Sequence, residues 1–93
     1  MDQHIIFLGV DKQVVFYDYF TREELRTSRF TAPLVDLLHR NEEECFMATL
    51  LGELYLVNKC EDHLESKLIS KQNKFTKNIV ITSNNLLNLR LFF

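Results

Sequence analysis

The residues of this 93-residue chain best suited to chemistry are those with the side chains that bind metal ions. Cys60 and His63 are separated by two residues, which is the spacing of half a zinc site, and His39 and Cys45 are candidates for the other half. The interval between the two halves is irregular, and such residues often coincide by chance. We therefore expect Cys45 in a buried strand, Cys60 in a loop and no bound metal.

The sequence contains little sign of paired catalytic carboxylates, a phosphate-binding loop or a nucleophile–histidine pair. The carboxylates of Glu42, Glu43 and Glu44 fall in a polar turn, where general acid–base pairs are difficult to tune without burial. Gly9 and Gly52 are the two glycines, too few for a glycine-rich phosphate loop. No nucleophile–histidine signature is present. We predict a protein that is not an enzyme and holds no cofactor.

Lysine side chains gather near the C-terminal end of the chain. All 13 acidic residues lie within 1–65, whereas 66–93 contains only basic charges. The basic segment 67–77 places four lysines around a single aromatic residue, Phe75; these are Lys67, Lys71, Lys74 and Lys77. One interpretation is a solvated surface, and the other is a basic patch that binds RNA or an acidic partner. The net charge of −2 favours the first interpretation.

Length and composition indicate one small globular domain. Hydrophobic residues make up 46% of the chain and charged residues 26%, as in ordinary soluble domains. No apolar run approaches the roughly 20 residues that span a bilayer, and no secretory leader is recognisable. Two cysteines do not make a disulfide framework. We expect an intracellular protein, cytoplasmic or nuclear, with no membrane association.

A repeated hairpin pattern is the strongest structural signal. Each copy has two short apolar or β-branched runs separated by a turn. The copies are 4–9 with 13–19, 45–50 with 53–58, and 78–83 with 86–93. The second runs end near Asp18, Asn58 and Phe93, at intervals of 40 and then 35 residues. This interval is typical of propeller blades, so we predict an all-β fold of antiparallel four-stranded blades, incomplete in number.

Two segments between the hairpins also carry helical signals. Thr21 is a candidate helix cap with Glu24 three residues later, and 34–39 fits either a strand or a helix. Within 61–77, the apolar residues have helical spacing. The alternative fold is therefore α+β with one or two short helices.

With these features the chain resembles the WD-repeat β-propeller family. Tyr17 and Asp18 correspond to the Trp-Asp pair of that family, and Val57 with Asn58 corresponds to it in the next copy. Phe92 lies near the equivalent point of a third, degenerate copy. The departures are clear, because Arg29-Phe30 stands where Gly-His is expected and the Trp-Asp pair is intact in no copy.

The resemblance implies a single partial propeller over residues 1–93. Its parts would be a half blade at 4–19, a blade at 23–58 and a degenerate blade at 63–93. Propellers have about 4–8 blades, and blades need neighbours to bury their faces. We therefore expect a non-catalytic interaction or scaffolding module, part of a larger complex or a fragment of a longer propeller, with protein partners or self-association.

Overall fold

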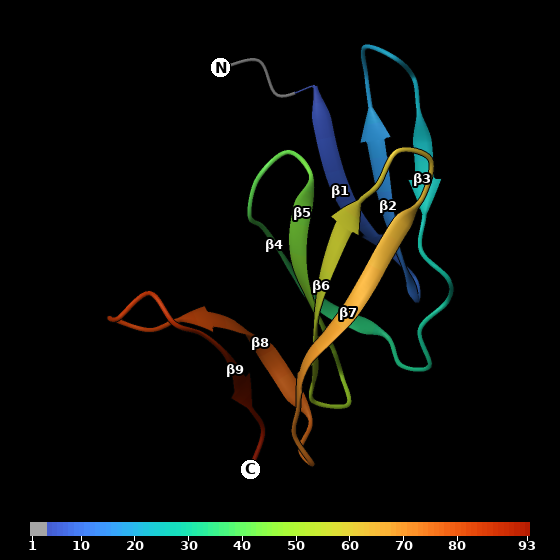
Figure 1. Cartoon of the computed structure of the whole chain (residues 1–93). Helices are drawn as coiled ribbons and strands as arrows, with labels where there is room; N and C mark the ends of the chain where they lie inside the picture. The colour runs from blue at the N-terminus through green and yellow to red at the C-terminus, as the bar shows by residue number, and fades with distance from the viewer. Residues whose placement is uncertain (1–3) are drawn as a thin grey trace.

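The protein is all-β, as the sequence predicts (Figure 1). The computed structural model describes residues 4–93, and within this range it has nine strands and no helix, hence no helix that could span a membrane. The strands are β1 (Ile5–Val10), β2 (Gln13–Asp18), β3 (Glu24–Arg26), β4 (Leu34–His39), β5 (Glu44–Thr49), β6 (Glu53–Lys59), β7 (Leu64–Lys71), β8 (Thr76–Ile81) and β9 (Leu87–Leu91).

The strands form three antiparallel sheets in chain order. The first sheet is β1-β2-β3, the second is β4-β5-β6-β7 and the third is the β8-β9 hairpin. Each neighbouring pair is antiparallel, so the first two sheets are simple meanders. All three expected hairpins are confirmed, as β1-β2, β5-β6 and β8-β9.

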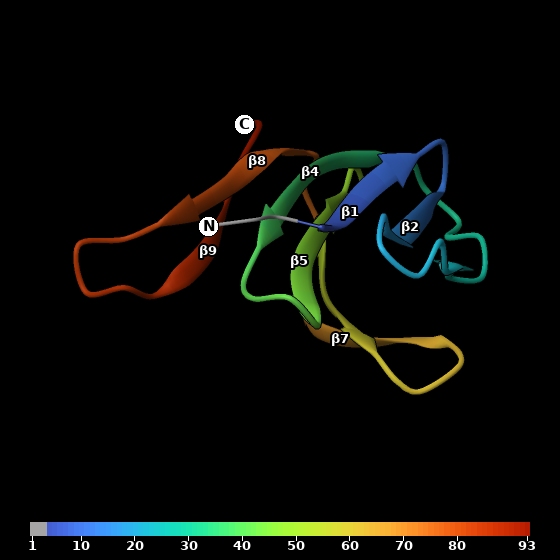
Figure 2. The same cartoon turned by 90° about the horizontal axis from the view of Figure 1, so that it is seen from above.

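The three sheets spread like a fan from their first strands. Seen from above, β1, β4 and β8 lie side by side, and the later strands of each sheet extend away from this line (Figure 2). The four-stranded sheet therefore has one sheet on each side. A strand that is covered on both faces needs apolar residues at consecutive positions, not only at alternate ones.

The first core lies between the β1-β2-β3 sheet and the β4–β7 sheet. The fully buried rings of Phe7 and Phe16 meet edge to face at 5.4 Å and pack with Cys45 and Met47 of β5. Leu25 joins this core from β3 because it stands opposite Phe16. Burial of these large side chains stabilises the packing of the two sheets, at about 1.5–3 kcal/mol for each side chain.

A second, smaller core lies on the other face of the β4–β7 sheet. Ala48 of β5 and Leu54 of β6 pack there against Ile79 and Leu89 of the third sheet. In β5, Cys45 and Met47 thus face the first core while Phe46 and Ala48 face the second. This alternation is the two-faced burial that the fan requires.

Two polar side chains of β4 connect the three sheets. Asp36 Oδ2 accepts a hydrogen bond of 2.8 Å from the backbone N–H of Ile79 in β8. His39 Nε2 accepts one of 3.2 Å from the backbone N–H of Phe7 in β1. An unpaired buried amide costs about 1–3 kcal/mol. These two acceptors on β4 therefore stabilise the packing of both neighbouring sheets against it.

The sheet boundaries differ from the expected blade boundaries. The four-stranded sheet covers 34–71 rather than 23–58, because β3 pairs with β2 and β7 pairs with β6. The half blade expected at 4–19 is extended by β3, and the third sheet begins at Thr76. Burial of Leu25 beside Phe16 explains the position of β3.

The helical alternatives are wrong for the described residues. Segment 34–39 is β4, and the helical spacing within 61–77 belongs to a strand, β7. Leu64 enters the first core, whereas Leu68 and Ile69 are exposed. Pairing with β6 gives the backbone of β7 hydrogen-bond partners from Leu64 to Lys71, with one bulge. A short helix in this segment would be only marginally stable by itself.

Replacing Asp36 tests the connection between the second and third sheets. We expect Asp36→Ala to lower the free energy of unfolding by about 1–3 kcal/mol, because the Ile79 amide loses its acceptor. Asp36→Asn keeps a side-chain oxygen and should retain most of the stability. Urea denaturation followed by circular dichroism measures both. Equal loss in the two variants would contradict the role of the acceptor.

Gly52 allows the β7–β8 connection to pack against the β5–β6 turn. Its φ is +78°, a conformation that side chains other than glycine rarely adopt. A Cβ atom there would collide with the carbonyl oxygens of Gln72 and Lys74. Gly52 C=O also accepts a 2.9 Å hydrogen bond from Gln72 N–H.

Alanine substitution at Gly52 and at Gly9 compares how much the fold depends on each glycine. We expect Gly52→Ala to destabilise the fold by about 1–3 kcal/mol or more, since strain and collision add together. At Gly9 a Cβ would meet the flexible end of Leu34 at 3.2 Å, so Gly9→Ala should cost less. Denaturation midpoints of the two variants measure the difference. A larger loss at Gly9 would contradict this interpretation.

Candidate functional site

Asp18 closes the turn that follows β2. Its Oδ1 accepts hydrogen bonds from the backbone N–H groups of Phe20 (2.9 Å) and Thr21 (3.2 Å). Desolvation raises the pKa of this carboxyl, but the hydrogen bonds from Thr21 and Phe20 outweigh it and the pKa is lowered. Asp18 therefore has a local turn-forming role.

The other expected repeat positions lie in different environments. Tyr17 is on the face of β2 away from Phe16, and its ring meets that of Tyr19 edge to face at 4.8 Å. Val57 is completely buried in the first core, whereas Phe92 is exposed after β9. Asn58 points its amide at the sulfur of Cys60. These side chains do not form one common site.

The turns of the fan lie at two opposite ends of the molecule. The β1–β2 turn, the segment before β4 and the β5–β6 turn are at one end, and the β4–β5 turn is at the other (Figure 1). Because loops often carry binding residues, the segments Val10–Gln13, Arg29–Pro33, Arg40–Glu44 and Leu51–Glu53 are candidate contact loops. They lie at two different ends and do not combine into one surface.

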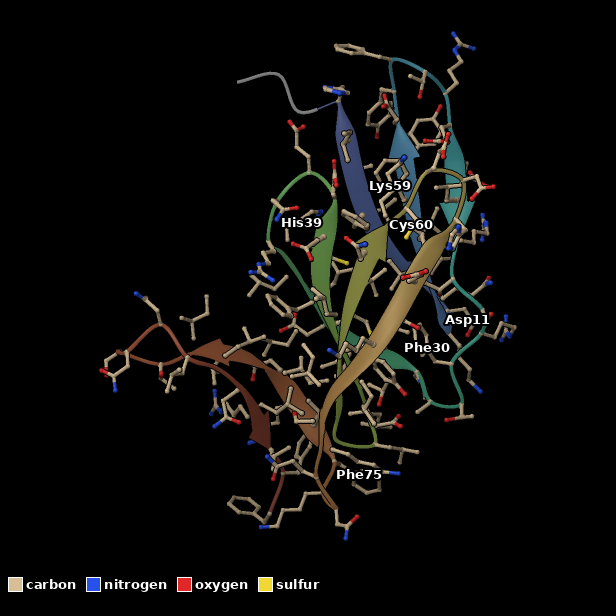
Figure 3. All side chains as sticks on the ribbon, viewed as in Figure 1. Asp11, Phe30, His39, Lys59, Cys60 and Phe75 are labelled. Atoms are coloured by element: carbon tan, nitrogen blue, oxygen red, sulfur yellow. The ribbon has the colours of Figure 1, made fainter. Side chains whose placement is uncertain are left out.

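Three of the four expected basic residues gather near the β7–β8 connection. Lys71 and Lys74 line one depression together with Phe75 and Phe93. Phe75 is exposed at the end of the molecule opposite the β2–β3 turn (Figure 3). Lys67 lies nearer the start of β7 and is not part of this depression.

Lys77 lies beside the same surface. Its Nζ is 5.0 Å from the ring centre of Phe92 and 5.6 Å from that of Phe93, within the range of cation–π attraction. The Phe92 N–H donates a 2.7 Å hydrogen bond to Phe75 C=O, which joins the backbone after β9 to the segment before β8. We call Lys71, Lys74, Lys77, Phe75, Phe92 and Phe93 the basic–aromatic surface.

The four residues considered as metal ligands do not come together. Cys45 is fully buried in β5, and burial raises the pKa of its thiol to about 12. His39 uses Nε2 to accept the Phe7 amide. Cys60 lies in the β6–β7 turn (Figure 3), so Cys45 is in a buried strand and Cys60 in a turn, as expected.

A different cluster forms at the β6–β7 turn. The sulfur of Cys60, a ring nitrogen of His63 and a carboxylate oxygen of Glu65 all lie within 4.8 Å of one another. His63 Nε2 is 3.2 Å from Glu65 Oε1, and His63 Nδ1 is 2.8 Å from Asp62 Oδ1. The Cys60 N–H donates a 2.9 Å hydrogen bond to His63 C=O and closes the turn.

Electrostatics of this turn follow from its carboxylates. Hydrogen bonds to Asp62 and Glu65 favour the imidazolium form and raise the pKa of His63. The same hydrogen bond from His63 lowers the pKa of Asp62. Partial desolvation, with the nearby charge of Glu65, raises the pKa of the Cys60 thiol. The turn thus attracts a proton or another cation.

Sequence reasoning named Cys60 and His63 but missed Glu65. Strand alternation is the signal that identifies it. Asn58 stands opposite Glu65 in the strand register, and two residues further toward the turn the Cys60 N–H bonds to His63 C=O, on the same face of the hairpin. Phe92 and Phe93 were likewise missed as neighbours of the lysines, because no local pattern relates β9 to the β7–β8 connection.

No protein-family model, no curated protein and no solved structure matches this chain. The class that the structure defines is an all-β protein of three antiparallel sheets. Its function is therefore argued from the open edges and side-chain clusters described above.

Proposed function

We propose that this protein is a non-catalytic intracellular interaction module of propeller type, as the WD-repeat resemblance implies. The fan of three sheets with adjacent first strands supports this proposal. So does the unequal size of the sheets, because the third contains only β8 and β9 in the described range. Its binding surface is the free edge of β9, where another strand can add to the sheet.

The free edge of β9 has the polar backbone groups that strand addition needs. Within residues 4–93 the Leu89 N–H has no strand partner on this edge, and it donates a 2.8 Å hydrogen bond to Oδ1 of the preceding residue, Asn88. Such an edge is a template for pairing. The side chains of Leu87, Leu89 and Leu91 all face the second core, so the edge has an apolar face and a polar face.

The pattern of β9 favours a second copy of the same strand as the partner. Its sequence Leu-Asn-Leu-Arg-Leu reads as a palindrome of apolar and polar residues. In antiparallel pairing about Leu89, Leu87 meets Leu91 of the second copy, and Asn88 meets Arg90. Like charges do not face each other, and the two-fold pairing makes a four-stranded sheet, equal in strand number to β4–β7.

Adding a positive charge to β9 tests this pairing. In Asn88→Lys, each new lysine would face Arg90 of the other copy, so the dimer would contain two repulsive contacts. At about 0.2–1 kcal/mol for each contact, the dimer should weaken about 2- to 30-fold. Combining it with Arg90→Glu should restore association. Sedimentation velocity across a concentration series measures the dimer constant.

Val80→Lys is the matched control, because Val80 shares the polar face of β8 and does not border the free edge. It should leave dimerisation unchanged. A wild-type chain that stays monomeric at several hundred micromolar contradicts the proposal, as does an Asn88→Lys variant that associates normally.

A second candidate function is supported by the basic–aromatic surface. Sequence alone offered one aromatic residue among the lysines, whereas in the structure Phe92 and Phe93 join Phe75. Lysines beside exposed rings fit single-stranded nucleic acid, whose phosphates pair with the charges and whose bases stack on the rings. We propose single-stranded RNA as this ligand.

Oligonucleotide binding tests the second candidate. Lys71→Glu with Lys74→Glu should weaken binding of a fluorescent single-stranded RNA by about tenfold or more, and wild-type affinity should fall as salt rises, because phosphate contacts release counterions. Lys12→Glu with Arg22→Glu makes the same charge change elsewhere and should have little effect. Equal weakening in both pairs, or binding to an acidic peptide but not RNA, would contradict this candidate.

A further inference from the structure

The β6–β7 turn presents a set of groups that neither the interaction edge nor the basic–aromatic surface uses. A thiol, an imidazole and a carboxylate from Cys60, His63 and Glu65 converge on one side of a single hairpin. We propose that these three side chains bind Zn²⁺, with solvent completing the coordination. Thiolate, imidazole and carboxylate are the three usual protein ligands of zinc.

The distances are close to those that coordination requires. Tetrahedral zinc with bonds of about 2.0–2.3 Å separates its ligand atoms by roughly 3.3–3.7 Å. His63 Nε2 and Glu65 Oε1 are already 3.2 Å apart, and all ligand atoms lie within 4.8 Å of one another. His63 and Glu65 are exposed, so rotation of side chains closes the remaining ångström without moving the backbone.

Asp62 sets the imidazole in the orientation that metal binding needs. It is 2.8 Å from His63 Nδ1, so Nδ1 donates to this carboxylate and Nε2 faces Glu65. In the neutral ring Nε2 has a lone pair, and a lone pair facing a carboxylate is unfavourable unless a proton or a metal cation lies between them. A carboxylate on the far nitrogen of a ligating histidine is a typical outer-shell arrangement in zinc sites.

The backbone and neighbouring side chains hold the turn in place. The Asn58 amide donates to Cys60 Sγ at 3.8 Å, which stabilises a thiolate. Lys59 Nζ donates to Cys60 C=O at 3.1 Å and also lies 3.4 Å from Glu23 Oε1 and 5.4 Å from the centre of the Phe16 ring. The end of β6 is thereby fastened to the first sheet beside the cluster (Figure 3).

Metal binding converts the Cys60 thiol to a thiolate and, where His63 is an imidazolium, also displaces the proton on Nε2; each proton released passes to solvent. No oxidation or reduction is involved. Cys45 does not compete, because it is completely buried in the first core.

Titration with Co²⁺, a spectroscopic substitute for Zn²⁺, tests this site in the reduced full chain. We expect one Co²⁺ per chain, a near-ultraviolet thiolate-to-cobalt band, and displacement of the band by Zn²⁺. Cys60→Ser should abolish the band although Cys45 is still present. His63→Ala and Glu65→Gln should weaken binding, and Asp62→Asn, which alters only the positioning residue, should weaken it about 10- to 100-fold.

Glu61→Gln is the matched control, since Glu61 is an exposed carboxylate in the same turn but outside the cluster. Its affinity for Co²⁺ should equal that of the wild type. Circular dichroism of each variant checks that the exposed substitutions leave the fold intact. Three outcomes would overturn the proposal: no thiolate band, an unchanged band in Cys60→Ser, or two chains per metal ion.

Discussion

Two-sided burial of the β4–β7 sheet is the constraint on which the rest of the structure depends. Alternate residues of β5 face opposite cores, Met47 toward the first sheet and Ala48 toward the third. Neither face can be left in water without losing the burial that stabilises it. Both flanking sheets are also joined to β4 by side-chain acceptors, Asp36 for the third sheet and His39 for the first.

This arrangement explains why the chemically interesting groups lie at the ends of the sheets. Strand centres are occupied by packing, so charged and reactive side chains remain at turns and free edges. The β6–β7 turn extends past the first core, and Lys59 anchors it through Glu23 and Phe16. The basic–aromatic surface lies at the opposite end, where the β7–β8 connection passes over Gly52 (Figure 1).

Features that depend on residues close together in the sequence could be predicted, and those that depend on distant residues could not. The hairpins could be predicted because a turn such as Leu51-Gly52 lies between two alternating runs, and both strands are close in sequence. The sheet that β3 joins could not be predicted, since it depends on Leu25 packing beside Phe16 in a core shared with the second sheet. The Cys60–His63 spacing was visible, whereas Glu65 and the loss of His39 and Cys45 as ligands required the hairpin register and the burial pattern.

The sequence by itself determined the all-β class, the three hairpins and the confinement of all acidic residues to positions 1–65. These features depend on local alternation, turn residues and composition. The tertiary structure decided which sheet each remaining strand joins and which distant side chains become neighbours. The physical reason is that backbone edges of different strands offer the same hydrogen-bonding groups, so burial of side chains from distant segments makes the choice.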